Sequence, residues 1–225
     1  MAIAFVQVKG TSQGAGGTSI AAAFTTNNVA GNAIIVVALW LFAGNHTATI
    51  ADSLGNTYST AVAKYGNGDA NSFSQIWFAS NIASGANTVT VTFSGNNAES
   101  YLIVSEYSGL ATAGMFDVQS SNQAAGTALD SLSATTTQAD ELIFGAGGNE
   151  VSVVTITPGT NFTLRLQQGQ LFSEDRIVTA IASYNATATQ DNTNFWQMAM
   201  ATFKGAVAAP GGPPKGSLML AGAGL

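Results

Sequence analysis

An unbroken apolar run stands between the turn residues Gly31-Asn32 and Gly44-Asn45. It reads Ala-Ile-Ile-Val-Val-Ala-Leu-Trp-Leu-Phe-Ala and contains no charge. Eleven residues are too few for a transmembrane helix, which needs roughly 20. The β-branched residues from Ile34 to Val37 lose rotamer freedom in a helix and pack well on a pleated surface. The run therefore predicts a β-strand that is apolar on both faces.

Alternation along this strand divides its side chains between two faces, because successive residues of a strand point to opposite sides of the sheet. One face carries Ile35, Val37, Leu39 and Leu41, and the other carries Ile34, Val36, Ala38, Trp40 and Phe42. One of these faces can contribute to the core of a sandwich. The second must be covered by another layer, by a long loop or by a neighbouring subunit.

Shorter strand patterns fill the rest of the chain up to Lys204, separated by Gly, Asn, Ser and Thr turns. The clearest is 87–94, where Val89, Val91 and Phe93 alternate with threonines. We expect a flexible loop at 10–17 and a hairpin turn at 52–56. Further strands are expected at 2–9, 18–25, 47–51, 57–65, 73–80, 100–107, 116–120, 129–136, 141–147, 151–157, 162–168, 176–184 and 195–204.

No stretch has a helical stripe longer than two turns, and no repeat of fixed period is apparent. The pattern predicts an all-β fold, a two-sheet antiparallel β-sandwich of jelly-roll type, in a domain that spans 1–204. A Pro/Gly-rich linker follows at 205–216, where prolines favour extended backbone. The chain then continues as an apolar segment, 217–225.

This last segment carries Leu218, Met219 and Leu220. Apolar side chains on a tether gain nothing unless a surface covers them. The segment is either a frayed terminus or an arm that docks on a neighbouring chain, and we favour the arm. Its three apolar residues, together with Trp40 and Phe42 on the central strand, are the candidate partner-binding residues.

The low charge content indicates a subunit of an assembly rather than a solitary domain. Charged residues make up 8% of the 225 residues, against about a quarter in ordinary soluble domains. A surface built mainly from uncharged polar residues is typical of proteins that pack against partners. The six basic residues are scattered, so we expect no nucleic-acid binding. Cysteine is absent, which excludes disulfides, thiolate zinc sites and thiol catalysis.

Residues 1–5 lead directly into a strand pattern without a basic region or an apolar signal core, so no secretory signal and no membrane anchor are expected unless a signal was trimmed. Neither a cofactor nor a metal is expected. His46 is the single histidine, and no spacing matches a regular calcium loop, although turn oxygens are available from Asp52, Asn56, Asp69 and Asn71.

The acidic residues could in principle act as a glycosidase pair, but structural roles are the expectation for each of Glu99, Glu106, Asp117, Glu141, Glu174 and Asp175. In the run Glu174-Asp175-Arg176 we expect a turn with a local ion pair. An aromatic platform for a sugar ring could be built from Trp77, Tyr58, Tyr65 and Phe73, with packing in the core as the alternative. Trp40 and Trp196 are expected in the core.

In overall style the chain resembles the small jelly-roll decoration, or cement, proteins and other accessory proteins of tailed-bacteriophage virions. The resemblance lies in the absence of cysteine, the low charge, the Gly/Thr/Ser/Asn-rich strands and the apolar arm beyond its linker. It implies a non-enzymatic structural protein on a capsid surface. It also implies a homo-oligomer, a trimer above all, that clamps neighbouring subunits of the major capsid protein.

A second hypothesis is a carbohydrate-binding or adhesion module of a bacterial surface protein or a phage fibre. Stretches such as 52–58 (Asp-Ser-Leu-Gly-Asn-Thr-Tyr) and 106–110 (Glu-Tyr-Ser-Gly-Leu) are similar to extracellular bacterial β domains. This hypothesis predicts exposed aromatic side chains and a glycan partner. Decoration of a capsid predicts aromatics buried in the core or at a subunit contact.

Overall fold

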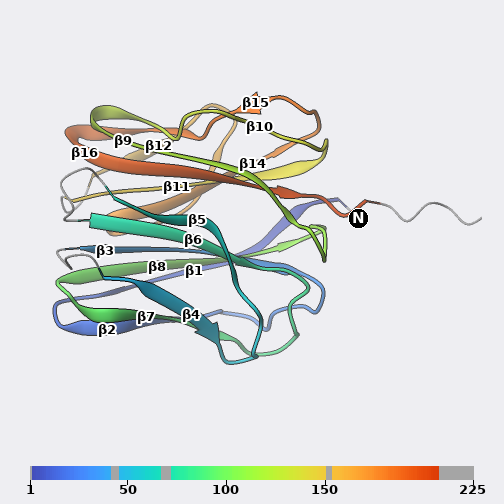
Figure 1. Cartoon of the computed structure of the whole chain (residues 1–225), viewed down its shortest axis with the longest axis horizontal. Helices are drawn as coiled ribbons and strands as arrows, with labels where there is room; N and C mark the ends of the chain where they lie inside the picture. Colours follow the sequence, from blue (N-terminus) through green and yellow to red (C-terminus); the bar gives the residue numbers. More distant parts are fainter. Residues whose placement is uncertain (1, 42–45, 67–71, 151–153, 208–225) are drawn as a thin grey trace, which may run out of the picture.

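A computed structural model describes residues 2–41, 46–66, 72–150 and 154–207. In these residues the chain forms sixteen strands and no helix. Its antiparallel sheets lie face to face in layers (Figure 1), which confirms the predicted all-β sandwich. No helix that is long and apolar enough to cross a membrane occurs among the described residues.

The predicted two-faced strand is β3, Ala33–Leu41, and it lies in the middle of a five-stranded sheet of order β1-β8-β3-β6-β5. All nine of its residues are buried. It pairs with β8 on one side and with β6 on the other. The other strands of this first large sheet are β1 (Ala4–Gln13), β5 (Ser59–Gly66), β6 (Ser72–Ala79) and β8 (Glu99–Ser108).

A second large sheet comes from the other half of the chain. It contains β11 (Glu141–Asn149), β13 (Thr163–Gln168), β14 (Leu171–Val178) and the long strand β16 (Thr187–Lys204). The strand β16 also pairs with β9 (Phe116–Asp130) and, near its start, with β12 (Ile156–Pro158).

Two small sheets complete the fold. The first has the order β2-β7-β4 and is built from β2 (Gly17–Ala23), β4 (Ala48–Asp52) and β7 (Thr88–Asn97). The second pairs β10 (Ala134–Thr135) with β15 (Ser183–Tyr184). In Figure 1 the β2-β7-β4 sheet lies beneath the first large sheet, and β10 and β15 lie at the opposite edge of the molecule.

Both faces of β3 are covered from within the chain. Ile35, Val37 and Leu39 pack against Phe144 and other side chains of the second large sheet. On the opposite face, Ile34, Val36, Ala38 and Trp40 pack against Ile20, Val89, Val91 and Phe93 of the small sheet. The predicted division of the side chains between two faces is therefore confirmed. The sequence left open whether another layer, a long loop or a neighbouring subunit covers the second face. In the structure, another layer covers it.

The two halves of the chain repeat one arrangement of strands, which sequence analysis did not detect. The first large sheet has the order β1-β8-β3-β6-β5, and the second contains β9-β16-β11-β14-β13. Adding eight to each strand number of the first order produces the second. The same holds on the outer side, where β2 pairs with β7 and β10 pairs with β15.

The halves also meet as two copies of one unit would meet across a two-fold axis. The strand β1 lies against β13, while β5 lies against β9, which is the same contact with the roles exchanged. The contacts of β6 with β11 and of β3 with β14 form another such pair. Such self-complementary contacts are characteristic of symmetric dimers, here formed within a single chain.

A buried polar group links the two halves. Tyr107 of β8 donates its hydroxyl proton to Asp175 of β14 at 2.6 Å, and the Nε of Arg165 contacts the same carboxylate oxygen at 2.7 Å. The guanidinium of Arg165 also lies over the ring of Phe5 in the first half. The turn predicted at Glu174-Asp175-Arg176 is therefore wrong: these residues lie within β14, and Asp175 pairs with Arg165 of the neighbouring strand.

Two other local predictions are wrong. The segment 52–56 does form a turn, but not a hairpin, since β4 pairs with β7 in the small sheet whereas β5 pairs with β6 in the large one. The expected loop at 10–17 is strand up to Gln13, because its backbone pairs with β8. At Gly10 a Cβ would lie 2.6 Å from a methyl carbon of Leu166, so glycine there lets the two halves approach.

The jelly-roll form and the docking arm stay predictions. The domain bounds 1–204 also stay a prediction; the last strand among the described residues ends at Lys204. The arm at 217–225 and most of the linker at 205–216 lie outside the described residues, which reach Val207.

We expect Trp40→Ala to cost about 3–5 kcal/mol of the free energy of unfolding, because the indole is fully buried against Phe73 and Phe93. Chemical denaturation followed by circular dichroism measures this change. Phe195→Ala is the control, since that side chain is 50% exposed and its removal should cost far less. Equal losses for the two variants would contradict the three-layer arrangement.

Candidate functional site

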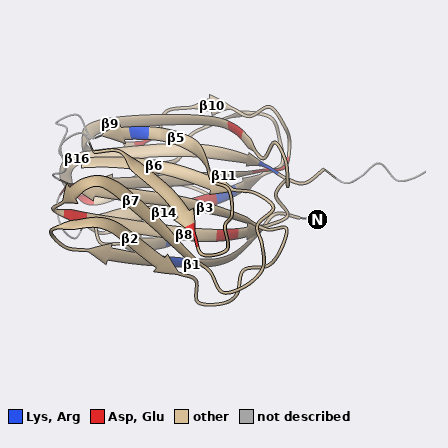
Figure 2. Ribbon diagram, turned by 60° about the horizontal axis from the view of Figure 1, so that its bottom comes forward, with Lys and Arg blue, Asp and Glu red and all other residues tan. Residues whose placement is uncertain are grey.

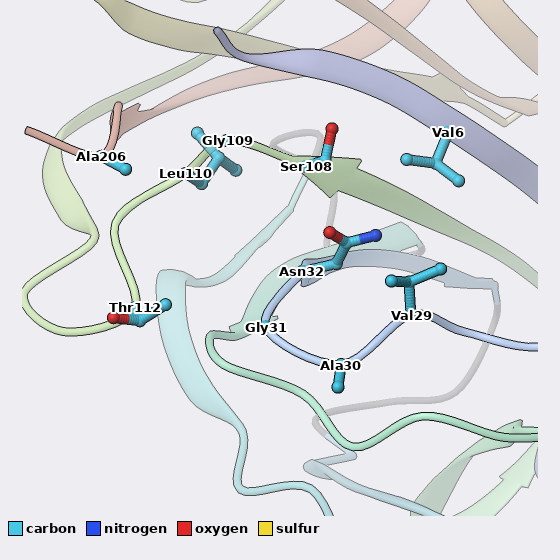
Figure 3. A pocket seen from close by; sticks show the side chains of 10 residues that line it. All are labelled: Val6, Val29, Ala30, Gly31, Asn32, Ser108, Gly109, Leu110, Thr112 and Ala206. Carbon is cyan, nitrogen blue, oxygen red and sulfur yellow. The ribbon is translucent and has the colours of Figure 1, made fainter. Parts of the chain in front are cut away.

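An open apolar pocket of about 530 Å³ lies at one end of the first half. Its walls come from the start of β1, the segment before β3, the residues after β8 and the end of the described chain (Figure 3). None of the described residues that line it is titratable; they are Val6, Val29, Ala30, Gly31, Asn32, Ser108, Gly109, Leu110, Thr112 and Ala206. The pocket is thus suited to bind apolar groups by burial.

A buried carboxylate holds one wall of this pocket in place. Glu106 is fully buried on β8, next to β3. Its Oε1 accepts hydrogen bonds from the backbone N–H of Val29 at 2.9 Å and from the side-chain amide of Asn32 at 2.7 Å. Its Oε2 accepts from the side-chain amides of Gln7 and Asn28, both at 2.7 Å. These four donors fix the segment that carries Val29 and Asn32.

Both ends of the described chain lie beside the pocket. Gly109 packs so closely on the start of the chain that a Cβ there would lie 2.1 Å from the carbonyl oxygen of Ala2, and its φ is +75°. Leu110 forms a β-bridge with Gly205, and the N–H of Ala206 donates to the carbonyl oxygen of Gly109. The described chain therefore ends at the rim of the pocket.

The sequence-predicted partner residues fall on different parts of the molecule. Trp40 is 0% exposed within the chain, so its ring has no surface left for a partner. Its packing agrees with the prediction that it belongs to the core, and Trp196 is buried as well. Phe42, Leu218, Met219 and Leu220 lie outside the described residues.

The possible sugar platform is used for packing. Trp77 is 3% exposed in the core between the first large sheet and the β2-β7-β4 sheet, and Tyr58 and Phe73 pack against the same core. Tyr65 packs against the core between the two large sheets. The four side chains therefore do not form one exposed surface.

The candidate metal-ligating residues act as turn stabilisers where they are described. Asp52 accepts hydrogen bonds from the backbone N–H groups of Leu54 and Asn56 and from the hydroxyl of Tyr58. Within the described ranges no three His, Cys, Asp or Glu side chains gather as a metal site would require, while Asp69 and Asn71 fall outside them. A ring nitrogen of His46 lies 3.2 Å from the side-chain oxygen of Asn97.

Among the remaining acidic residues, Asp117 and Glu141 share one hydrogen-bond network. Although burial opposes ionisation, hydrogen bonds from Thr137 and the ion pair with Lys204 lower the pKa of Asp117 to about 2. Burial, with a smaller contribution from Asp117, raises the pKa of Glu141 to about 7.

Burial also raises the pKa of Glu174, to about 8. Its Oε2 accepts a hydrogen bond from the backbone N–H of Gly159 at 3.2 Å. Asp175 is engaged by Tyr107 and Arg165, and Glu99 accepts the hydroxyl proton of Tyr101 at 2.6 Å.

Sequence analysis missed Val6, Val29 and the amides around Glu106. Single valines in loops and bulges are common, and their spacing carries no period. Only the pair of asparagines at 28 and 32, just before a buried strand, offered a signal, since such amides must find hydrogen-bond partners once the strand is buried.

Comparison with known proteins adds no relative: no protein-family model, no curated protein and no solved structure matches this chain.

We expect Glu106→Gln to cost about 2–3 kcal/mol of the free energy of unfolding, because the new NH₂ group would face amide donors and leave some of them unpaired. Equilibrium denaturation measures the loss, and amide hydrogen exchange should rise at Val29. Glu99→Gln is the matched control at a partly exposed position on the same strand. An unchanged exchange rate at Val29 would argue against a wall held by Glu106.

Glu174 makes stability depend on pH. The folded protein keeps its proton up to about pH 8, whereas an unfolded glutamate loses it near pH 4.5. The folded state therefore binds more protons in this interval, and the free energy of unfolding should fall as pH rises, by about 1.4 kcal/mol per pH unit.

Chemical denaturation of the wild type and of Glu174→Gln, from about pH 5 to about pH 8, checks this. The neutral amide should remove this part of the fall. A smaller fall up to about pH 7 should remain, because Glu141 titrates in the same direction. Parallel pH profiles for the wild type and the variant would contradict the assignment to Glu174.

Proposed function

We propose that this protein is a non-enzymatic structural subunit of a large assembly, of the kind formed by capsid decoration and other accessory proteins of tailed-phage virions. The observation that carries the proposal is the apolar pocket at the end where the described chain stops. Exposed valines surround it: Val6 is 39%, Val29 is 54% and Val207 is 78% exposed. Apolar surface of this kind gains free energy when a neighbouring chain covers it.

The chemistry of the surface supports packing against neighbours. Six basic and twelve acidic residues are spread over 225 positions, and Figure 2 shows those in the described part of the chain as isolated spots on a largely uncharged fold. An interface with few charges loses little free energy to desolvation when it forms. The proposal includes a homo-oligomer, a trimer, that clamps subunits of the major capsid protein from the capsid surface.

The surroundings of Glu106 favour binding over catalysis. Its two oxygens are engaged by four N–H donors, and Asn32 lies between this carboxylate and the pocket. A general acid or base must reach the substrate with an oxygen that is free to exchange a proton. The pocket can therefore hold a partner group without reacting with it.

The carbohydrate-binding alternative, an extracellular adhesion module, depends on exposed aromatic rings. The three tryptophans, Trp40, Trp77 and Trp196, are each at most 3% exposed. Structural assembly is thus the function that the geometry favours, and glycan binding becomes an outcome of the test.

We expect the full chain to form trimers or larger species at micromolar concentrations, measured by sedimentation velocity. Replacing Leu218, Met219 and Leu220 together by serine should weaken association at least tenfold, because the arm would lose the apolar surface that it buries. Leu132→Ser is the control: this side chain is 52% exposed and is not among the residues that line the pocket. A chain that stays monomeric and binds polysaccharide would favour the adhesion module instead.

A further inference from the structure

The repeat of the two halves identifies a second corner of the molecule that corresponds to the pocket. Phe5 stands opposite Tyr107 in the pairing of β1 with β8, and Phe116 stands opposite Phe203 in the pairing of β9 with β16. Both pairs pack edge to face, with ring centroids 5.8 Å and 6.3 Å apart. Both are next to an irregularity in the register of their strands.

This match identifies the residues of the second half that are equivalent to residues around the pocket. Val6 follows Phe5 as Asp117 follows Phe116, and Ser108 follows Tyr107 as Lys204 follows Phe203. A third observation agrees with this assignment. Tyr107 pairs with Ala33, and Phe203 pairs with Leu142. Two residues before each of these partners the chain has a positive φ, at Gly31 and Asp140.

The equivalent corner of the second half is closed. The ammonium of Lys204 contacts the carboxylate of Asp117 at 3.0 Å, and Thr137 donates to the same carboxylate from its backbone N–H at 2.6 Å and from its hydroxyl. In the first half these two positions hold Val6 and Ser108, which face the pocket (Figure 3). The two halves thus have the same strand pairing here. Because the first half has Val6 and Ser108 where the second half has an ion pair, its corner is open and apolar.

We propose that this pocket receives the Leu218-Met219-Leu220 segment of a neighbouring copy of the chain. The inference rests on the proposed function and names the receiving surface for the arm. The pocket volume of about 530 Å³ suits a few apolar side chains, and the lining residues that the structure describes carry no charge. The segment 217–225 likewise carries no charged side chain, so neither partner desolvates a charge on binding.

The length and composition of the connection favour a neighbouring copy. The described chain ends at Val207, next to the lining residue Ala206, and Leu218 follows eleven residues later. Eleven extended residues span about 34 Å. Pro213 and Pro214 favour extended backbone, which disfavours an immediate return to the pocket beside Ala206. An arm of this reach suits a pocket on an adjacent subunit.

The decisive variant transfers the ion pair of the second half into the first. Val6→Asp combined with Ser108→Lys, made in the full chain, should close the pocket with the pair that Asp117 and Lys204 already form on the equivalent backbone. Self-association should weaken at least tenfold, with an unchanged circular dichroism spectrum. Val29→Ser is a second variant that removes one exposed wall residue and keeps the fold.

A labelled peptide of residues 215–225 tests the contact directly. We expect it to bind saturably to a full chain in which residues 218–220 are serine, and at least tenfold more weakly when the pocket is also closed. An arm that docks elsewhere would leave both the association and the peptide affinity unchanged by pocket closure, which overturns this inference and leaves the proposed function standing. A chain that is monomeric at all concentrations yet binds the peptide would overturn docking between copies and the proposed assembly together.

Discussion

The fold depends on one strand that has no polar face. Every residue of β3 is buried, so both of its faces require an apolar cover. A single two-sheet sandwich covers only one side of each sheet. The chain resolves this with three layers, in which the first large sheet lies between the small β2-β7-β4 sheet and the second large sheet. The unusual apolar content of this strand is therefore satisfied inside one polypeptide.

The second large sheet is provided by a repeat of the same strand order, so that the contact between the halves is that of a symmetric dimer formed within one chain. Its centre is apolar, and the linked side chains of Tyr107, Asp175 and Arg165 add a directional contact within it. Buried polar groups of this kind restrict how two apolar faces can align, because any other alignment leaves them unpaired. The two halves nevertheless differ at their equivalent corners, one closed by an ion pair and the other open as the apolar pocket.

The low surface charge and the apolar pocket both favour association through the burial of apolar surface. Burial of apolar surface is favourable wherever two complementary faces meet, and it needs no catalytic group or bound ion. The same effect that joins the halves would join this subunit to its neighbours in the proposed assembly. Glu106 contributes to this surface by accepting the hydrogen bonds that hold the wall of the pocket.

The sequence by itself determined the all-β class, the strand apolar on both faces and the assignment of Ile35 and Trp40 to opposite faces, because alternation along a strand is a local property. Only the tertiary structure decided what covers those faces. It also decided that Asp175 pairs with Arg165 and that Val6 and Ser108 leave a pocket open, since these contacts join strands far apart in the chain. The repeat stayed hidden for the same reason: strand order is a property of pairing between distant segments, and quite different side chains can satisfy it.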